Sequence, residues 1–239
     1  MERFFVQPAQ IQENEAWITG DDVAHITRVL RCRVNDMLVL VDGAGMEYTA
    51  RIVEISKQSV RLALVEQRAC EGETACRVTL YQALPKAGKM ETIVQKCVEL
   101  GVFAIQPVQS ERCVVRPDDF EKKRVRYQRV AHEAAKQSRR GIVPELLPLQ
   151  PLAECAFSAY DTALIAYEEE SERMLKDALR GGKFQNIALI VGPEGGFTQE
   201  EVANVARRGA VPVSLGKRIL RTETAGMAML AMTLYELES

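Results

Sequence analysis

The stretch Ile187-Ala188-Leu189-Ile190-Val191-Gly192-Pro193-Glu194-Gly195-Gly196-Phe197-Thr198 decides the fold of the second part of the chain. The unbroken apolar run from Ile187 to Val191 predicts a buried strand of a parallel sheet. Gly192 to Gly196 predict a turn, and Thr198 with Glu201 predicts a capping box at the start of a helix. Such strand-to-helix turns lie at the carboxyl edge of parallel sheets, where α/β proteins bind ligands.

The same alternation of strands and helices continues on both sides of this stretch. Apolar runs predict strands at residues 78–83, 104–108, 162–166, 187–191 and 211–215. Helical periodicity predicts helices at residues 89–100, 121–138, 171–179, 199–208 and 223–237. This order is typical of a mostly parallel sheet with helices on its faces.

The first part of the chain follows a different pattern. Residues 37–65 show the short apolar runs and alternation of strands, which predict a small β-rich unit. Ahead of it, Asp21 or Asp22 is expected to cap a short helix. Residues 67–75 are polar and without periodicity, so we interpret them as an interdomain linker. We therefore expect one domain at residues 1–70 and a second at residues 71–239.

Composition excludes several classes of protein. The chain has 239 residues, 47% of them hydrophobic, which is enough for a sizeable core. No run of eighteen apolar residues occurs, and the first residues lack the apolar region of a signal peptide, so we expect a cytoplasmic protein without a membrane span. The net charge of -2 implies that any nucleic-acid contact comes from local basic patches.

The cysteines and histidines do not form a recognisable metal site. The six cysteines are scattered without a C-x-x-C pair, and the two histidines are His25 and His132. Neither a zinc site nor a disulfide framework is predicted, and we interpret the cysteines as reduced thiols that mostly fill the core.

The glycine-rich turn at Gly192 to Gly196 has two interpretations. It lacks the Lys-Ser/Thr of a P-loop and the G-x-G-x-x-G of a dinucleotide fold, so phosphate binding is not favoured. Its glycines could let backbone amides approach a ligand, or they could merely permit a tight turn.

A second segment, Leu215 to Ala225, also connects a predicted strand to a predicted helix. Arg221, Thr222, Glu223 and Thr224 offer charge and hydroxyl groups that could hold a polar substrate. Alternatively, Thr222 caps the last helix, Glu223 complements its dipole, and Arg221 is solvated.

A basic stripe is predicted on the helix at residues 121–138 and just beyond it. At 100° per residue one face carries Lys122, Arg126, Arg129, Lys136 and Arg140. This stripe suits a phosphate backbone, but charge runs are often only the solvated side of a helix, and Glu133 interrupts it. A second candidate patch comprises Arg28, Arg31 and Arg33.

Taken together, these segments resemble the RsmE family, the bacterial 16S ribosomal RNA (uracil-N3)-methyltransferases of the SPOUT superfamily. The resemblance is carried by Gly192-Pro193-Glu194-Gly195-Gly196 and by Ile219-Leu220-Arg221-Thr222-Glu223-Thr224-Ala225. Further similar segments are Pro85-Lys86-Ala87-Gly88-Lys89-Met90-Glu91, Gln95-Lys96, Glu99-Leu100-Gly101-Val102, Ser110-Glu111-Arg112, Gln137-Ser138, Arg3-Phe4-Phe5 and His25-Ile26 to Leu30-Arg31. Lys136, where an acidic residue is more usual, and Gly226, where larger residues are common, depart from the pattern.

The resemblance implies a fold and an activity. It implies a PUA-like β-barrel domain followed by a SPOUT-type α/β domain, whose parallel sheet has a C-terminal trefoil knot. It also implies a homodimer that binds S-adenosyl-L-methionine and methylates N3 of a uridine in 16S rRNA, which we expect in the assembled small ribosomal subunit. Because the sulfonium already activates the methyl group, we expect no metal.

On this basis we predict three groups of site residues. The catalytic candidates are Arg221, which would favour the deprotonated base, and more weakly Thr222 and Glu223. The general base stays open between Glu223 and Glu194. The cofactor-binding candidates are Leu164, Ile165, Ala166, Gly192, Pro193, Glu194, Gly195, Gly196, Leu215, Gly216, Ile219, Leu220, Thr224 and Ala225. The RNA-binding candidates are Arg3, Arg28, Arg31, Lys86, Lys89, Arg112, Arg126, Arg129, Arg139 and Arg140.

Two other functions compete with this prediction. The chain could be an RNA-binding module without catalysis, which an absence of S-adenosylmethionine binding would favour. It could also bind a nucleotide for redox or phosphate chemistry, but the fingerprints of those folds are missing.

Overall fold

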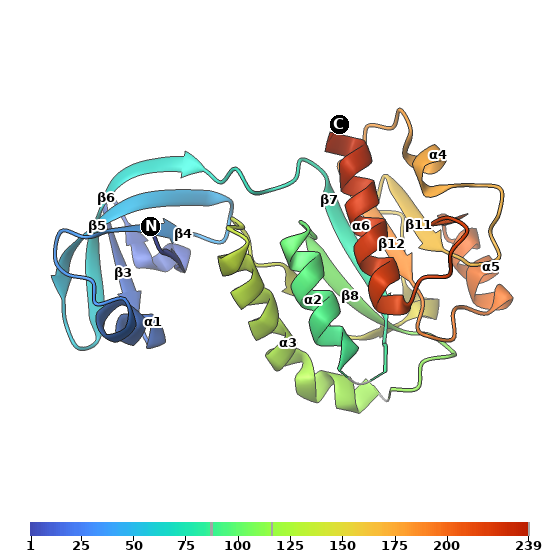
Figure 1. Cartoon of the computed structure of the whole chain (residues 1–239), viewed down its shortest axis with the longest axis horizontal. Coiled ribbons are helices and arrows are strands. Elements are labelled where there is room, and N and C mark those ends of the chain that lie inside the picture. Colours follow the sequence, from blue (N-terminus) through green and yellow to red (C-terminus); the bar gives the residue numbers. More distant parts are fainter. Residues whose placement is uncertain (87, 116, 239) are drawn as a thin grey trace. The chain divides into compact units, whose positions relative to one another are not determined.

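The computed structural model describes residues 1–86, 88–115 and 117–238, without the side chains of residues 117–119. Ala87, part of one family-like segment, lies outside the described residues. The chain forms two compact units (Figure 1): Met1–Glu73 with Ala135–Val143, and Thr74–Ala134 with Pro144–Ser239. The return of residues 135–143 to the first unit has no local sequence signal, and the boundary at residue 70 stays a prediction.

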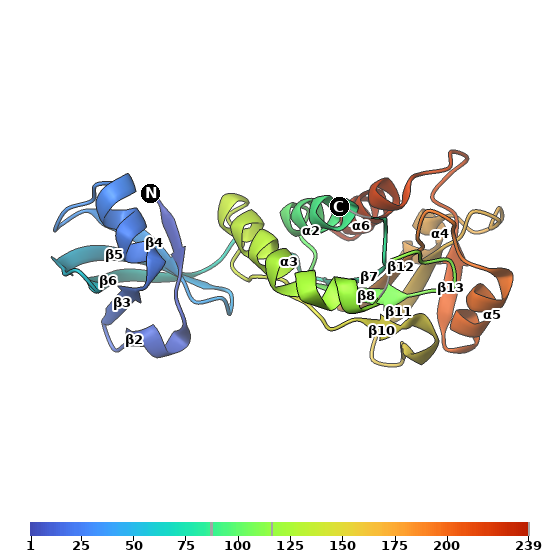
Figure 2. The same ribbon diagram turned by 90° about the horizontal axis from the view of Figure 1, so that it is seen from below.

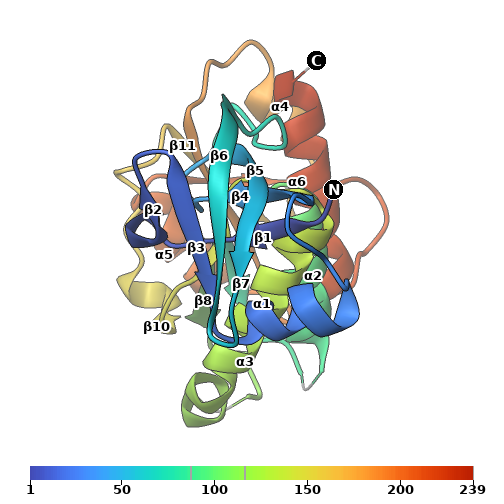
Figure 3. The ribbon, with the colours of Figure 1, turned by 90° about the vertical axis from the view of Figure 1, so that its left-hand side faces the viewer.

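The first unit is built on a curled six-stranded sheet (Figure 3). Its strand order is β1-β4-β5-β6-β3-β2, with β1 and β4 parallel and the other pairs antiparallel. The strands are β1 (Arg3–Phe5), β2 (Ile11–Gln12), β3 (Glu15–Thr19), β4 (Met37–Val41), β5 (Met46–Ile55) and β6 (Ser59–Ala69). The β-rich unit predicted at residues 37–65 is confirmed by β4, β5 and β6. The predicted linker begins too early, because Gln67, Arg68 and Ala69 pair with β5.

The short helical segment of the first unit begins differently from the prediction. Helix α1 (Asp21–Ala24) continues into a π-helical turn (His25–Val29), and a 3-10 turn (Pro8–Gln10) precedes β2. The N-cap residue is Gly20, at φ +73°, with no side-chain cap. Asp21 and Asp22 therefore do not cap the helix but lie in its first turn, where their charge complements the helix dipole.

The second unit contains a seven-stranded sheet in which every pairing is parallel. Its order is β10-β8-β7-β12-β11-β13, with β9 also paired to β8. The strands are β7 (Arg77–Ala83), β8 (Ala104–Gln109), β9 (Glu145–Leu146), β10 (Gln150–Pro151), β11 (Thr162–Ala166), β12 (Asn186–Val191) and β13 (Ala210–Val213). All five predicted strands are present, and the α/β prediction is confirmed.

Helices cover both faces of this sheet (Figure 2). The helices are α2 (Lys89–Glu99), α3 (Pro117–Gln137), α4 (Leu175–Leu179), α5 (Gln199–Arg207) and α6 (Thr222–Glu238), with a 3-10 turn at Leu152–Glu154. Helix α6 packs on β7 and β12, while Val202 and Val205 of α5 join the core on the opposite face. Helix α4 is shorter than predicted, because the Glu170 carboxylate accepts the backbone N–H groups of Glu172 and Arg173 and holds a turn there.

Gly226 has a packing role in α6. A Cβ atom there would lie 3.1 Å from Gln82 Oε1 and 3.5 Å from a methyl carbon of Leu80. The missing side chain therefore lets α6 approach β7 closely, which offsets the cost of a glycine inside a helix. In the described part of the chain no helix is both long and apolar enough to cross a membrane.

Candidate active site

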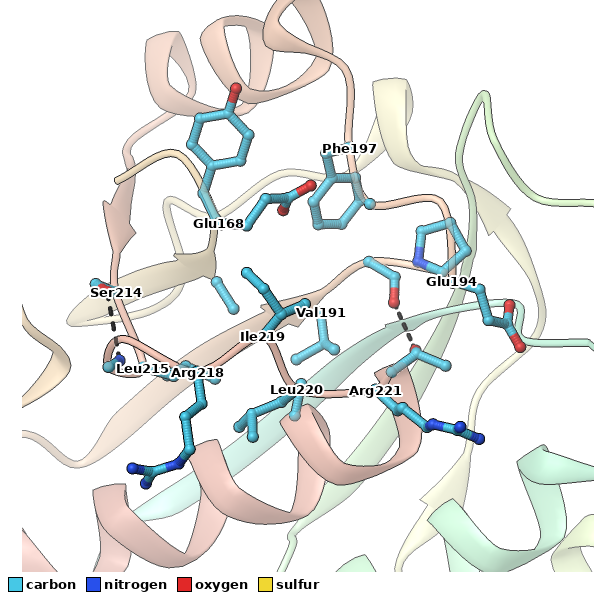
Figure 4. Close-up of a pocket in the computed structure, with 18 of the residues that line it drawn as sticks. Glu168, Val191, Glu194, Phe197, Ser214, Leu215, Arg218, Ile219, Leu220 and Arg221 are labelled. Carbon is cyan, nitrogen blue, oxygen red and sulfur yellow. Dashed lines mark hydrogen bonds between the residues drawn. The ribbon is translucent and has the colours of Figure 1, made fainter. Parts of the chain in front are cut away.

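A cavity of about 490 Å³ lies at the carboxyl edge of the second sheet (Figure 4). Its walls are the loops that follow β11, β12 and β13, together with the first turn of α6. The volume falls within the roughly 300–1,000 Å³ typical of small-molecule sites. Ten predicted cofactor-binding residues line it: Ala166, Gly192, Pro193, Glu194, Gly196, Leu215, Gly216, Ile219, Leu220 and Ala225.

The three loops meet because of the strand order. Strand β11 lies between β12 and β13, and all three run in the same direction. Their carboxyl ends therefore lie side by side at one edge, although β11 and β13 are separated in the chain by β12 and α5. The glycine-rich turn and the second loop thus enclose one cavity.

The glycine-rich turn is shaped by close contacts. Gly196 has φ +66°, and a Cβ atom there would collide with the Glu168 carboxylate. Arg112 donates a hydrogen bond of 2.7 Å to the Gly195 carbonyl oxygen, which places Gly195 against Arg112 and off the lining of the cavity. The turn thus requires glycine and also borders the cavity, so the two sequence interpretations are compatible.

Thr222 joins the two loops and is buried. Its hydroxyl donates a hydrogen bond of 2.6 Å to the Gly192 carbonyl oxygen and accepts one of 2.9 Å from Gln82 Nε2 (Figure 4 draws the first). Thr222 therefore does not cap α6. Because its hydroxyl is already engaged on both sides, its geometry is that of a residue that positions the loops.

Lys89 forms ion pairs with two carboxylates of the site. Its ammonium lies 2.9 Å from Glu194 Oε1 and 3.0 Å from Glu223 Oε2. Partial burial works to raise the pKa of Glu194, but Lys89 and the backbone N–H groups of Glu194 and Lys86 lower it on balance. The pKa of Glu223 is lowered, first by its own backbone N–H and then by Lys89. A lowered pKa weakens both carboxyl groups as proton acceptors.

The remaining side chains of the second loop point in different directions. Figure 4 shows the side chain of Ile219 toward the middle of the cavity, and Arg218 and Arg221 pointing outward on opposite sides. Arg221 lines the cavity and is exposed, so its guanidinium is accessible to a substrate. Thr224 is exposed and does not line the cavity.

Two predicted cofactor residues do not line the cavity with their side chains, and a role for their backbone stays a prediction. Leu164 and Ile165 are completely buried in β11, because this strand is central and covered on both faces, so their side chains cannot reach a ligand. The prediction omitted lining residues from the ends of the strands and the loops beyond them: Tyr167, Glu168, Val191, Phe197, Ser214 and Arg218. Their position at or just after the predicted strand ends was the signal that could have identified them.

The RNA-binding candidates divide into exposed and engaged side chains. Those exposed are Arg28, Arg31, Lys86, Arg112, Arg126, Arg129 and Arg139, although Arg126 forms an ion pair with Glu91. Lys89 is engaged with Glu194 and Glu223, and Arg112 holds the glycine-rich turn.

The prediction is wrong for Arg140, and Arg3 is also engaged within the first unit. Arg140 is 2% exposed, and its guanidinium forms a bidentate ion pair with Glu73, at 2.8 and 2.7 Å. This burial removes Arg140 from the basic stripe. Arg3 forms an ion pair with the buried Glu47, which Arg68 also contacts.

The described residues contain no group of three or more His, Cys, Asp or Glu side chains placed to hold a metal ion. All six cysteines are free thiols, and Cys76, Cys97 and Cys155 are buried. Burial raises the pKa of the Cys97 thiol to about 12, so this group is inert core filler.

Comparisons with known proteins agree with this architecture. Residues 72–234 match the family model described as the RNA methyltransferase domain, and residues 18–65 match the RNA methyltransferase PUA domain. The fold, the cavity and these matches define the class of the protein as a two-domain RNA methyltransferase with a PUA domain.

Full-length relatives narrow the class to a family. The chain is 34% identical to the ribosomal RNA small subunit methyltransferase E of Bacillus subtilis, covering 100% of this chain and 98% of the relative. The crystal structure of the Neisseria gonorrhoeae enzyme of that name, bound to S-adenosyl methionine, has a TM-score of 0.85 at 35% identity and covers 97% of this chain and 96% of that chain. A putative methyltransferase from Legionella pneumophila in complex with the same cofactor has a TM-score of 0.81 at 31% identity, with the same coverage. The chain belongs to the ribosomal RNA small subunit methyltransferase E family.

Proposed function

We propose that this chain transfers a methyl group from S-adenosyl-L-methionine to N3 of a uridine in the 16S rRNA of the small ribosomal subunit. The names of the relatives support the ribosomal RNA substrate and the cofactor. The observation that carries the proposal is the cavity that the glycine-rich turn and the second loop form together at one edge of the parallel sheet.

The residues of this cavity fit the cofactor. Apolar side chains of Val191, Leu215 and Leu220 suit the adenine ring, and turn backbone at Gly192 and Gly216 can approach a ligand closely. Gly196 shows the tightness of the cradle, because a Cβ there would meet Glu168. When bound, the cofactor supplies a methyl group activated by the positive charge of its sulfonium.

The residues of the chain would align the target base and promote loss of its N3 proton. Arg221, exposed beside the cavity, is the proposed catalytic residue, because a fixed positive charge favours the anionic form of the uracil ring. Thr222, Glu223 and Glu194 are proposed to hold the loops in shape, with the proton passing to solvent. The base must be unstacked from its neighbours to reach the cavity.

The proposal also includes the oligomeric state of the chain and its location in the cell. We propose a cytoplasmic homodimer, with a trefoil knot in the second unit and the assembled small subunit as substrate. Leu230 and Leu234 of α6 are buried in the chain's own core. Met232 and Tyr235 of α6 are 39% and 77% exposed and are better placed to meet a second copy.

The test is methyl transfer to undermethylated small ribosomal subunits, followed by mass spectrometry of the nucleosides. The expected product is N3-methyluridine at one site. Methylation of a different base, or none at all under conditions where the cofactor binds, would overturn the proposal.

A further inference from the structure

A second cavity lies beside the candidate active site, in the same unit. It measures about 280 Å³. Its walls are Leu84, Pro85, Lys86 and Gly88 after β7, Val114 and Val115 before α3, and residues of α2 and α3. Lys86 lines both this cavity and the larger one. A molecule that spans Lys86 could therefore occupy both.

The walls of the second cavity combine apolar and cationic groups. Its apolar part includes Met90, Phe120 and Tyr127, which are nearly buried, and Val114, which is 73% exposed. The rings of Phe120 and Tyr127 lie 5.6 Å apart between centroids, tilted by 36°. The Tyr127 hydroxyl has no hydrogen-bond partner among the described residues, so it can bond a ligand.

The apolar and cationic groups come from one face of α3. Phe120, Lys123 and Tyr127 follow the i, i+3, i+7 spacing of that face, so two buried aromatic rings line the cavity with an exposed lysine between them. Lys86 and Lys123 are exposed cations. Aromatic rings beside cations are the chemistry with which proteins bind single-stranded RNA.

We propose that this second cavity receives an unstacked nucleobase adjacent to the target uridine, with Lys86 and Lys123 at the phosphates on either side. This inference rests on the proposed function, since it assumes an RNA substrate in the larger cavity. Arg126 and Arg129, which continue the basic stripe along α3, would then contact the phosphates of the RNA strand beyond that base. The second cavity thus selects a sequence or shape next to the methylated position.

The test compares two charge reversals on neighbouring residues of α3. Lys123→Glu changes a cation that lines the cavity, and Lys122→Glu changes an exposed cation that does not. Binding of the full chain to undermethylated small subunits is measured directly by filter binding, with the Michaelis constant from methyl transfer beside it. We expect Lys123→Glu to weaken binding about tenfold and Lys122→Glu less than about threefold. Tyr127→Phe, which removes only the hydroxyl, should weaken binding about two- to fivefold.

The outcomes separate this inference from the proposed function. Cofactor affinity by calorimetry should be unchanged in all three variants, which also shows that they fold. Lys123→Glu and Lys122→Glu could weaken subunit binding equally, with no effect of Tyr127→Phe. That result would indicate only a general electrostatic attraction to RNA and would overturn the proposed role of the second cavity. If the wild-type chain binds subunits without methylating them, the proposed function fails, while the binding comparison still decides the role of the second cavity.

Discussion

The Thr222 hydroxyl donates a hydrogen bond of 2.6 Å to the Gly192 carbonyl oxygen, and this bond joins the two loops of the candidate active site. The loops are far apart in the chain, and Gln82 on β7 supports the contact from the other side. The bond is partly buried, so its loss leaves a partly desolvated carbonyl group without its partner.

Thr222→Val, which keeps the shape and removes the hydroxyl, should therefore lower the free energy of unfolding by about 1–3 kcal/mol and weaken cofactor binding. Chemical denaturation and calorimetry measure the two effects. Thr222→Ser should restore both, and Thr224→Val, at an exposed position, is the control. An unchanged cofactor affinity in Thr222→Val would show that the loops hold their positions without this bond.

Gly196→Ala should destabilise the chain chiefly through backbone conformation, because the Glu168 carboxylate is the end of an exposed side chain that can move aside. Positive φ costs an L-residue about 1–2 kcal/mol, and the added methyl group also collides with the Glu168 carboxylate. Gly209→Ala is the matched control, because Gly209 has φ +99° and open space around its Cβ position. The two glycine variants should therefore lose similar stability in denaturation experiments, and Glu168→Ala in the Gly196→Ala background should recover little. A large recovery would mean that the carboxylate cannot move aside.

Arg221→Ala should reduce turnover by about 10²- to 10³-fold and leave cofactor binding almost unchanged. The reason is that Arg221 is exposed beside the cavity, where its charge can act on the substrate base. Single-turnover methyl transfer and calorimetry measure the two quantities. Lys217→Ala, an exposed neighbour that does not line the cavity, is the control. Turnover equal to that of the wild type would remove Arg221 from the site.

Lys89→Gln should remove a part of the stability that depends on pH in a defined direction. The pKa values of Glu194 and Glu223 in the folded chain lie below the ordinary value of 4.5. A lowered pKa contributes stability that is present above the unfolded-state pKa and is lost as pH falls through the folded-state value. The difference in melting temperature between wild type and Lys89→Gln should be constant from about pH 6 to 8 and shrink below about pH 4. Lys96→Gln, which breaks a partly exposed i,i+3 pair with Glu99 within one helix, should show little difference at any pH. A similar difference for both variants would argue against a special role for Lys89.

Arg140→Gln should cost about 3–5 kcal/mol of stability, because it leaves the Glu73 carboxylate without its bidentate partner. Arg139→Gln, at the exposed neighbouring position, should cost much less. Urea denaturation of the two variants makes the comparison. Similar stabilities would place Arg140 back among the residues available for RNA.

The sequence by itself determined the local elements and the family. Apolar runs located β7, β8, β11, β12 and β13, and the capping box of Thr198 and Glu201 occurs as predicted. These features depend on neighbouring residues along the chain, through periodicity, backbone preferences and short-range hydrogen bonds. The resemblance to the methyltransferase family likewise needed only the order of its motifs.

Only the tertiary structure decided which residues meet. The pairing of β13 with β11 brings the second loop to the glycine-rich turn, and no local pattern specifies that neighbour. The ion pairs of Lys89 with Glu194 and Glu223, and the burial of Arg140 against Glu73, join residues distant in sequence. A charged side chain looks the same in sequence whether it is solvated or paired, because its environment is set by packing. That is why periodicity placed Arg140 on an RNA-binding face, while the fold buries it in an ion pair with Glu73.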